Sequence, residues 1–229
     1  MKYHIIYADP PWAYNARKNL DTKFGGGVHG HYPVMDLEDI KNLNIQRMCE
    51  DNAVLFMWAT FPRLPQALEV MAAWGFTYKT LGFSWHKTNK DGSLFHGVGS
   101  YAKSNCEVCL FGTKGKVGIV KKGQPIPDPK EKLVVRSNFV SSAINAPKER
   151  HSKKPDEVRN RIVELFGDVS RIELFARQSS EGWSVWGNEV EEVVEGMITK
   201  VEHIIEKAVE NELPRFRRYK LNENQNDSG

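Results

Sequence analysis

A six-residue apolar run that ends at two consecutive prolines is the feature that most constrains the fold of this chain. Tyr3–Ala8 is short and mostly apolar, as expected for a strand that is buried on both faces of a sheet. The run stops at Asp9-Pro10-Pro11, where the prolines prevent a helix or a strand ladder from continuing. Such a strand indicates an α/β fold. The turn after it would lie at the carboxyl edge of the sheet, where open α/β folds bind ligands.

Strand-like and helix-like segments alternate along the rest of the chain. Strands are expected at residues 54–58, 77–87, 105–112, 171–176 and 183–186. Helices are expected after Asp36, a suitable N-cap, between Pro62 and Gly75, and between Pro155 and Gly167. The second of these helices should bury one face, formed by Leu64, Leu68, Met71 and Trp74. The alternation predicts a mainly parallel sheet with helices on both faces.

Length and the pattern near the C-terminus predict one domain with a long final helix. The 229 residues allow one substantial α/β domain but not comfortably two. Apolar residues recur at helical spacing through residues 190–213. We expect a single domain over residues 1–213, whose last helix packs on its own sheet or pairs with a second copy. Residues 214–229 are expected to form a basic segment and then a disordered end.

Apolar runs and cysteines predict a cytoplasmic protein without a membrane segment or a metal. No apolar run approaches the roughly 18 residues of a membrane span. The three cysteines Cys49, Cys106 and Cys109 are irregularly placed and do not suggest a disulfide framework. Cys106 and Cys109 would point to opposite faces of a strand, and no second Cys or His pair lies at matching spacing. We therefore expect no bound metal.

Positive charge is concentrated in the middle of the sequence. Residues 114–161 contain 13 Lys or Arg against 5 Asp or Glu, although the formal net charge of the whole chain is only +3. Such a concentration suits a polyanionic partner such as nucleic acid, and a solvated loop would explain the charge alone equally well. Within this segment, residues 115–148 are rich in Gly, Pro and charge, and we expect them to form a loop.

The turn at Asp9-Pro10-Pro11-Trp12 has the groups needed to hold an exocyclic amine on a planar base. The Asp9 carboxylate and the Pro10 carbonyl can each accept one N–H hydrogen bond, and the Trp12 indole offers a flat stacking surface. Adenine N6 is a poor nucleophile because its lone pair is delocalised into the ring. Two acceptors would orient that lone pair towards an electrophile. The alternative is a proline-rich turn with a packed tryptophan.

Asp9-Pro10-Pro11-Trp12 resembles the catalytic motif of the MT-A70 family of adenine-N6 methyltransferases. Further segments resemble those of the family in the same order, and together they cover roughly residues 3 to 190. They are His31-Tyr32-Pro33-Val34-Met35, Trp85-His86-Lys87-Thr88-Asn89, residues 107–115, residues 151–157, residues 171–177 and residues 182–189. Several blocks in order are far more specific than a single tetrapeptide.

The resemblance implies a Rossmann-like fold that binds S-adenosylmethionine, with the catalytic motif preceding the cofactor motif in a permuted order. Catalytic roles then fall to Asp9, Pro10, Pro11 and Trp12. The resemblance places Tyr32, Trp85, Glu107 and Lys154 around the substrate. It places Lys154, Arg177, Ser180, Asn188 and Glu189 at the cofactor. The expected cofactor strand is not followed by a glycine-rich fingerprint, so side chains should do more of the binding.

The function implied is methyl transfer to adenine N6 in a flipped or single-stranded base of DNA. The glycine-rich residues 15–30 and the basic residues 115–148 would close over cofactor and nucleic acid. DNA is preferred because the compact chain, without added RNA-recognition modules, resembles bacterial or phage members of the family. RNA as substrate, a catalytically silent nucleic-acid-binding subunit and an enzyme for a small-molecule amine are the alternatives. A homodimer or a partner subunit stays open.

Overall fold

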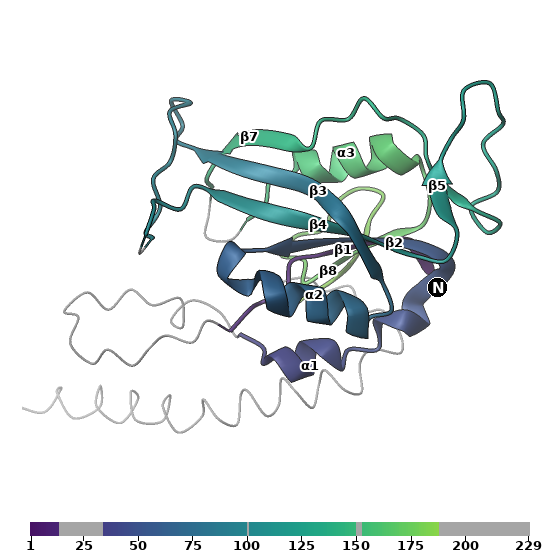
Figure 1. Cartoon of the computed structure of the whole chain (residues 1–229), viewed down its shortest axis with the longest axis horizontal. Coiled ribbons are helices and arrows are strands. Elements are labelled where there is room, and N and C mark those ends of the chain that lie inside the picture. Colours follow the sequence, from purple (N-terminus) through teal and green to yellow (C-terminus); the bar gives the residue numbers. More distant parts are fainter. Residues whose placement is uncertain (14–33, 100, 150–152, 188–229) are drawn as a thin grey trace, which may run out of the picture.

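The computed structural model describes residues 1–13, 34–99, 101–149 and 153–187. Its centre is a seven-stranded sheet (Figure 1). The strand order is β7-β3-β4-β2-β1-β8-β9. The strands are β1 (Tyr3–Ala8), β2 (Cys49–Ala59), β3 (Thr77–Thr88), β4 (Cys106–Lys114), β7 (Ala143–Pro147), β8 (Arg171–Leu174) and β9 (Ser184–Trp186). Strand β4 is antiparallel to β2 and β3, and all other neighbours are parallel. The prediction of a mainly parallel sheet is confirmed.

Helices cover both faces of this sheet, as the sequence predicts. Helices α1 (Leu37–Lys41) and α2 (Leu64–Ala73) lie together on one face, and α3 (Glu157–Phe166) lies on the other (Figure 1). Short 3-10 turns, η2 (Ile45–Met48) and η3 (Phe61–Arg63), flank β2. Within the described residues, no helix is long and apolar enough to cross a membrane. The predicted helix at 190–213 and the tail at 214–229 lie outside the described residues.

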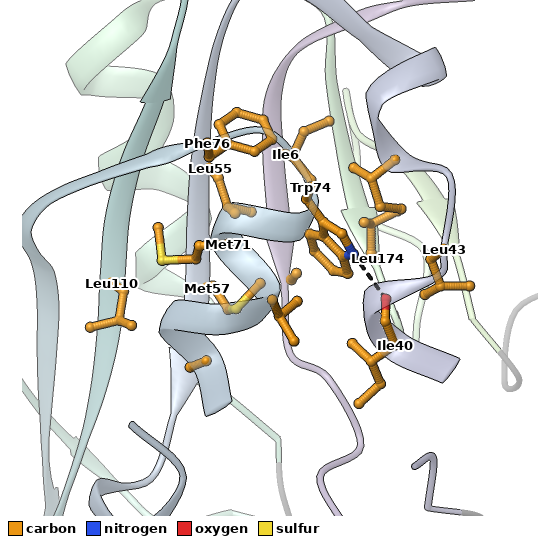
Figure 2. Close-up of a cluster of buried hydrophobic side chains, with 14 of the residues drawn as sticks. Ile6, Ile40, Leu43, Leu55, Met57, Met71, Trp74, Phe76, Leu110 and Leu174 are labelled. Atoms are coloured by element: carbon orange, nitrogen blue, oxygen red, sulfur yellow. Dashed lines mark hydrogen bonds between the residues drawn. The ribbon is translucent and has the colours of Figure 1, made fainter. Parts of the chain in front are cut away.

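The core under α1 and α2 is apolar throughout. Met71 and Trp74 are fully buried against the sheet, and the Trp74 Nε1–H donates to the Ile40 carbonyl at 2.9 Å, which joins the two helices (Figure 2). The predicted face of α2 is wrong at one position, because Leu68 is 37% exposed. Ala67 and Val70 are buried in its place, so the buried face keeps Met71 and Trp74 but is shifted away from Leu68.

The core under α3 is rich in aromatic rings. Strand residues alternate between faces, so Ile5 and Tyr7 of β1 point towards α3 while Ile6 and Ala8 point towards the other core. Helix α3 contributes a buried stripe to this core, namely Val158, Ile162 and Phe166. The helix ends at Gly167, whose φ of 77° is a left-handed conformation that glycine adopts without strain.

Helix α1 begins directly after Asp36, as predicted, but two local details differ from the sequence-based expectation. Asp36 precedes α1 in an extended conformation, but its side chain makes no capping hydrogen bond. Strand β8 ends at Leu174 instead of residue 176, because Phe175 has a positive φ of 61° and turns the chain out of the sheet. The turn after β8 is therefore tighter than the sequence pattern indicates.

The basic segment at residues 115–148 is not the single loop that was predicted. It contains β5 (Val117–Ile119) and β6 (Leu133–Val135), which form a separate two-stranded sheet, and then β7 at the edge of the main sheet. These strands are three to five residues long, and the residues around them are rich in Gly and charged side chains. An alternation of apolar and polar residues cannot be recognised over so short a length.

The first part of this segment lies near the amino ends of β1 and β2, whereas Asp9 follows the carboxyl end of β1. Asn52, at the start of β2, accepts a hydrogen bond from Lys116 N and donates to the carbonyl of Lys130. Because β1 and β2 are parallel, the start of β2 is far from the end of β1, which leads into Asp9 (Figure 1). The β5–β6 part is therefore not placed to close over a cofactor or nucleic acid bound beside Asp9, as was expected of residues 115–148 as a whole.

Candidate active site

Asp9 lies at the carboxyl end of β1, between two parallel neighbours, β2 and β8. Its Oδ2 is 2.7 Å from Nζ of Lys154, which precedes Pro155 and helix α3. The Lys154 side chain is almost completely buried, and the Asp9 side chain is 23% exposed. The ion pair thus joins two residues that are 145 positions apart in the sequence. The resemblance gives Asp9 a catalytic role and places Lys154 at both substrate and cofactor. The partly exposed carboxylate retains acceptor capacity beyond its contact with Lys154.

A second carboxylate shares the same lysine. Oε2 of Glu107, on β4, is 3.3 Å from Nζ of Lys154, and its Oε1 pairs with Nζ of Lys87 on β3. The four side chains form a row of alternating charges, Asp9, Lys154, Glu107 and Lys87, whose formal charges cancel. Charge balance and charge-assisted hydrogen bonds are what allow ionic groups to persist at low exposure.

Burial and neighbouring charges shift the pKa values of this row in different directions. Burial raises the pKa of Asp9, and the attraction of Lys154 offsets this effect only in part. Burial also raises the pKa of Glu107, but Lys154 and Lys87 outweigh it and bring the pKa below its usual value. For Lys154, burial opposes the charge, yet the two carboxylates raise the pKa. Lys154 therefore remains a cation, and the pKa values of the two carboxylates that share it are shifted in opposite directions.

Trp58, near the end of β2, packs against the Lys154 ammonium group. The Lys154 Nζ lies 5.7 Å from the centroid of the indole, and the Trp58 Nε1–H donates to the Tyr7 hydroxyl at 2.7 Å. Sequence reasoning missed this residue. The available signal was its position, because a tryptophan ending a buried strand that is parallel to β1 comes to the same edge as Asp9.

The tryptophan of the turn, Trp12, packs inward. Trp12 is 7% exposed, and its Nε1–H donates to the Trp58 carbonyl at 3.2 Å. It belongs to the core under α1 and α2, which differs from the open stacking surface predicted for it. The Pro10 carbonyl accepts a hydrogen bond from Trp12 N at 2.9 Å and the Pro11 carbonyl accepts one from Met35 N at 3.0 Å. These bonds fix the turn, and a carbonyl retains a second lone pair.

Trp85 is also a buried support in this structure. It is 2% exposed, and its Nε1–H donates to the Ala146 carbonyl at 2.9 Å. Its ring packs edge-on against Trp58, and Lys87 Nζ lies 4.9 Å from its centroid. Trp85 thus holds Lys87, the partner of Glu107, and presents little surface for direct substrate contact.

Arg63 is a further residue that sequence reasoning missed. It lies in η3, directly after β2, and its guanidinium donates to the Ala13 carbonyl, the residue that follows Trp12. An arginine in the turn after a strand parallel to β1 is placed at the same edge as Asp9. This contact helps to hold the exit of the catalytic turn.

The predicted cofactor side lies on the turn after β8, next to Asp9. Arg177 is close enough to lower the pKa of Asp9 electrostatically, and the Ser180 carbonyl accepts a hydrogen bond from Trp183 N at 3.1 Å. The turn is anchored by Ala176 N, which donates to the Trp186 carbonyl at 2.9 Å. Of the remaining predicted site residues, Tyr32, Asn188 and Glu189 lie outside the described residues.

The described residues contain no cluster of three or more His, Cys, Asp or Glu side chains that could hold a metal ion. Cys109 is buried in the core under α3, whereas Cys106 is half-buried at the start of β4. The groups gathered at the edge are carboxylates and cations that already pair with one another. The chemistry that they support is recognition of hydrogen-bond donors and of anionic groups.

Comparison of the sequence with known proteins identifies the family of this chain. The MT-A70 family model matches residues 3–189. The chain is 32% identical over 202 residues to the type II methyltransferase M.MunI of a Mycoplasma species, covering 82% of this chain and 78% of that protein.

Two eukaryotic relatives match over the same share of this chain. It is 25% identical to a putative N(6)-adenosine-methyltransferase MT-A70-like protein of Medicago truncatula and 25% identical to the human N(6)-adenine-specific methyltransferase METTL4. Each match covers 82% of this chain, but it spans only 26% of the plant protein and 37% of the human protein. Because the family match extends over the described sheet and the turn at Asp9-Pro10-Pro11-Trp12, the chain belongs to the MT-A70 family of adenine-N6 methyltransferases.

Proposed function

We propose that this chain transfers a methyl group from S-adenosylmethionine to the N6 amine of adenine in DNA, with Asp9 as the residue that holds the amine. The observation that carries the proposal is the partly exposed Asp9 carboxylate, fixed by Lys154 at the carboxyl edge of the sheet in an Asp-Pro-Pro turn. A carboxylate fixed in this way is preorganised to accept a hydrogen bond without further movement.

Asp9 and the Pro10 carbonyl act on the amine by orientation. Each accepts one N–H of the N6 group, and this directs the nitrogen lone pair away from the turn. Lys154 holds Asp9 through Oδ2, and Trp58 supports Lys154 from below. The raised pKa makes Asp9 a stronger acceptor than an ordinary aspartate, which suits an amine whose N–H bonds become more acidic as a bond to carbon forms. In this proposal Trp12 maintains the turn from inside the core.

The cofactor is proposed on the chemistry of the residues beside Asp9. Arg177 and Lys154 are cations at the edge formed by β1 and β8, and they fit the carboxylate of an amino-acid moiety. Ser180, Asn188 and Glu189 are proposed to complete the cofactor site, the last two through ribose hydroxyls. When bound, S-adenosylmethionine supplies an electrophilic methyl group on a sulfonium, so the chain itself needs no nucleophilic side chain.

DNA is proposed as the substrate because of the relatives and the extent of their match. The chain covers 78% of the type II methyltransferase M.MunI but about a quarter of the plant adenosine-methyltransferase. We take the substrate of the type II class, which is DNA, as the better guide. The target adenine would be flipped out of a duplex or taken from a single strand, because N6 is otherwise engaged in base pairing.

The test is transfer of labelled methyl from S-adenosylmethionine to DNA and RNA oligonucleotides of matched sequence, each single- and double-stranded. We expect label in DNA that is recovered as N6-methyladenine. Label in RNA alone would retain the reaction and replace the substrate. Absence of transfer to every oligonucleotide, together with absence of cofactor binding, would contradict the proposal and favour a catalytically silent subunit.

A further inference from the structure

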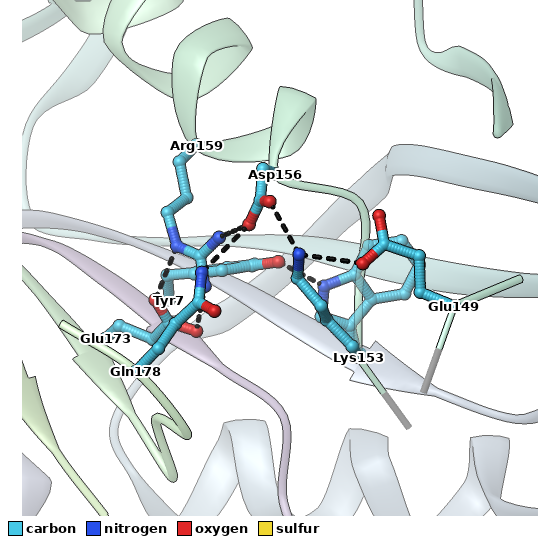
Figure 3. Close-up of polar contacts among 8 residues, drawn as sticks. Tyr7, Glu149, Lys153, Asp156, Arg159, Glu173 and Gln178 are labelled. Atoms are coloured by element: carbon cyan, nitrogen blue, oxygen red, sulfur yellow. Dashed lines mark hydrogen bonds and ion pairs between the residues drawn. The ribbon is translucent and has the colours of Figure 1, made fainter. Parts of the chain in front are cut away.

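A second polar network lies beside the catalytic row, at the start of helix α3. Its hub is Asp156, which receives hydrogen bonds from Lys153 Nζ at 2.8 Å, Arg159 Nη1 at 2.6 Å and Gln178 Nε2 at 3.3 Å (Figure 3). Asp156 occupies the N-cap position of α3, yet its side chain makes no capping hydrogen bond. An aspartate at this position ordinarily serves the helix, so these contacts indicate a different use.

The network is anchored to the sheet by a buried ion pair. Arg159 Nε and Nη2 donate to the two carboxylate oxygens of Glu173 at 2.6 and 2.8 Å, a two-pronged contact between side chains that are each about 10% exposed. Glu173 is in β8, opposite Tyr7 of β1, and the Arg159 guanidinium lies 5.9 Å from the centroid of the Tyr7 ring. This geometry fixes the Arg159 head group, and through it Asp156, relative to the strands of the active site.

Asp156 therefore ties together two segments that are distant in the sequence. Lys153 directly precedes Lys154, the partner of Asp9, and Gln178 directly follows Arg177 on the turn after β8. One carboxylate thus contacts the chain next to both cations that we assign to the cofactor. Figure 3 shows Lys153 and Arg159, which flank Asp156 in the chain, and Gln178 of the turn after β8 all directed towards Asp156.

We propose that Asp156 is a positioning residue that sets the distance between Lys154 and Arg177 and thereby determines how tightly the amino-acid end of the cofactor is held. The inference rests on the proposed function, since it assumes that these two cations bind the cofactor. It adds a residue that contacts neither substrate nor cofactor and acts through the two segments it joins. Loss of its charge should weaken cofactor binding and leave the chemistry at Asp9 intact.

The next residue of the same helix provides a matched control. Glu157 pairs with Arg161 at 2.6 Å, and Arg161 donates to the Ala143 carbonyl at 2.8 Å. This pair joins α3 to β7 at the outer edge of the sheet, whereas the Asp156 network joins α3 to β8. Both acidic residues lie at the positive end of α3, so any loss of favourable helix-dipole interaction should be similar in the two.

The experiment compares Asp156→Asn and Glu157→Gln in steady-state methyl transfer and in calorimetric binding of S-adenosylhomocysteine. For Asp156→Asn we expect the KM for S-adenosylmethionine and the Kd for S-adenosylhomocysteine to rise about threefold to tenfold, with kcat within about twofold. Glu157→Gln should leave all three values within about twofold of the native protein. Unfolding midpoints should be similar, because both substitutions keep the shape of the side chain.

A double-mutant cycle with Gln178→Ala completes the test. Gln178 is exposed, so its truncation leaves the fold intact, and we expect the double variant to bind no more weakly than Asp156→Asn alone. Unchanged binding of S-adenosylhomocysteine in Asp156→Asn, or an equal loss in Glu157→Gln, would overturn the positioning role of Asp156. Methyl transfer by the native protein would still support the proposed function in that case. A native protein that neither binds S-adenosylhomocysteine nor transfers methyl would overturn both.

Discussion

The two faces of the central sheet are built from the same strands but carry different side chains. Under α1 and α2 the sheet presents aliphatic residues such as Ala8, Met57 and Leu110, and the hydrogen bond from Trp74 to Ile40 joins the two helices above them. Under α3 it presents aromatic residues such as Tyr7 and Trp58, and buried charges accompany them. The first face supplies stability, and the second combines packing with the candidate chemistry.

Strand alternation explains why the charges gather on the α3 side. Residues two apart on a strand point to the same face of the sheet. A residue at the carboxyl edge therefore lies on the α3 face when the residue two positions away on its strand is buried in the α3 core. Asp9 comes two residues after Tyr7, Lys87 two after Trp85, and Glu107 two before Cys109 on antiparallel β4. An aromatic row on one face therefore continues into a charged row at the edge, and Lys154 enters that row from the start of α3.

Among the variants that compare the two faces, the largest effect should come from removing the cation that the charged row shares. Lys154→Met leaves Asp9 and Glu107 as neighbouring carboxylates without their common partner, so we expect methyl transfer to fall by roughly 100-fold or more. Lys41→Met, on the α1 side, is the matched control and should change the rate by less than about twofold, because that lysine pairs with Glu38 at the surface. Initial rates at saturating cofactor and DNA measure both. Equal losses in the two variants would remove the functional distinction between the faces.

The aliphatic face should respond in stability instead of activity. Met71→Ala removes a fully buried side chain beneath α2 and should cost about 2–5 kcal/mol in the free energy of unfolding, with kcat of the folded fraction within about twofold. Urea unfolding followed by tryptophan fluorescence measures the loss.

Leu68→Ala on the same helix is the control for this prediction. Leu68 is substantially exposed, and its truncation should change the free energy of unfolding by about 0.5 kcal/mol or less. The sequence pattern would have placed both residues in the core. If Leu68→Ala were as costly as Met71→Ala, the orientation of α2 in this structure would be wrong.

The smallest effect should be a shift in pH dependence. Asp9 must be ionised to accept the amine and to pair with Lys154, so activity should fall as the pH drops through its raised pKa, at a higher pH than an ordinary aspartate would give. Glu107 contributes to that elevation by repulsion. Glu107→Gln should therefore lower the Asp9 pKa and move the acid limb of the kcat profile to lower pH. An acid limb that moves to higher pH would contradict the assignment of Asp9 as the titrating group.

The carboxyl edge could be predicted from the sequence because its signals are local. An apolar strand ended by Asp9-Pro10-Pro11 determines both the edge and the turn, and the structure confirms that position. The pairing of Asp9 with Lys154 was not evident from composition or spacing, since it depends on how α3 crosses the sheet. The resemblance indicated Lys154 as a site residue, but its partner is a finding of the structure.

Other parts of the site could not be predicted because they depend on packing that a linear pattern does not contain. Trp12 has a ring suited to stacking, yet the ring is buried in the core under α1 and α2, and its Nε1–H donates to the Trp58 carbonyl. The β5–β6 sheet is held at the amino ends of β1 and β2 partly through hydrogen bonds of Asn52, a single polar residue near the start of β2. Neither position leaves a periodic signal in the sequence.

The most direct test of the central claim is methyl transfer to adenine-containing DNA by native protein and by Asp9→Asn, with the product nucleosides identified by mass spectrometry. Asparagine keeps the shape of Asp9 but introduces N–H donors where acceptors are needed. We predict N6-methyladenine with native protein, a loss of roughly 1000-fold in rate with Asp9→Asn, and similar thermal unfolding of the two proteins. Methyl transfer by Asp9→Asn at the native rate would contradict the role given to Asp9 and the account built on it.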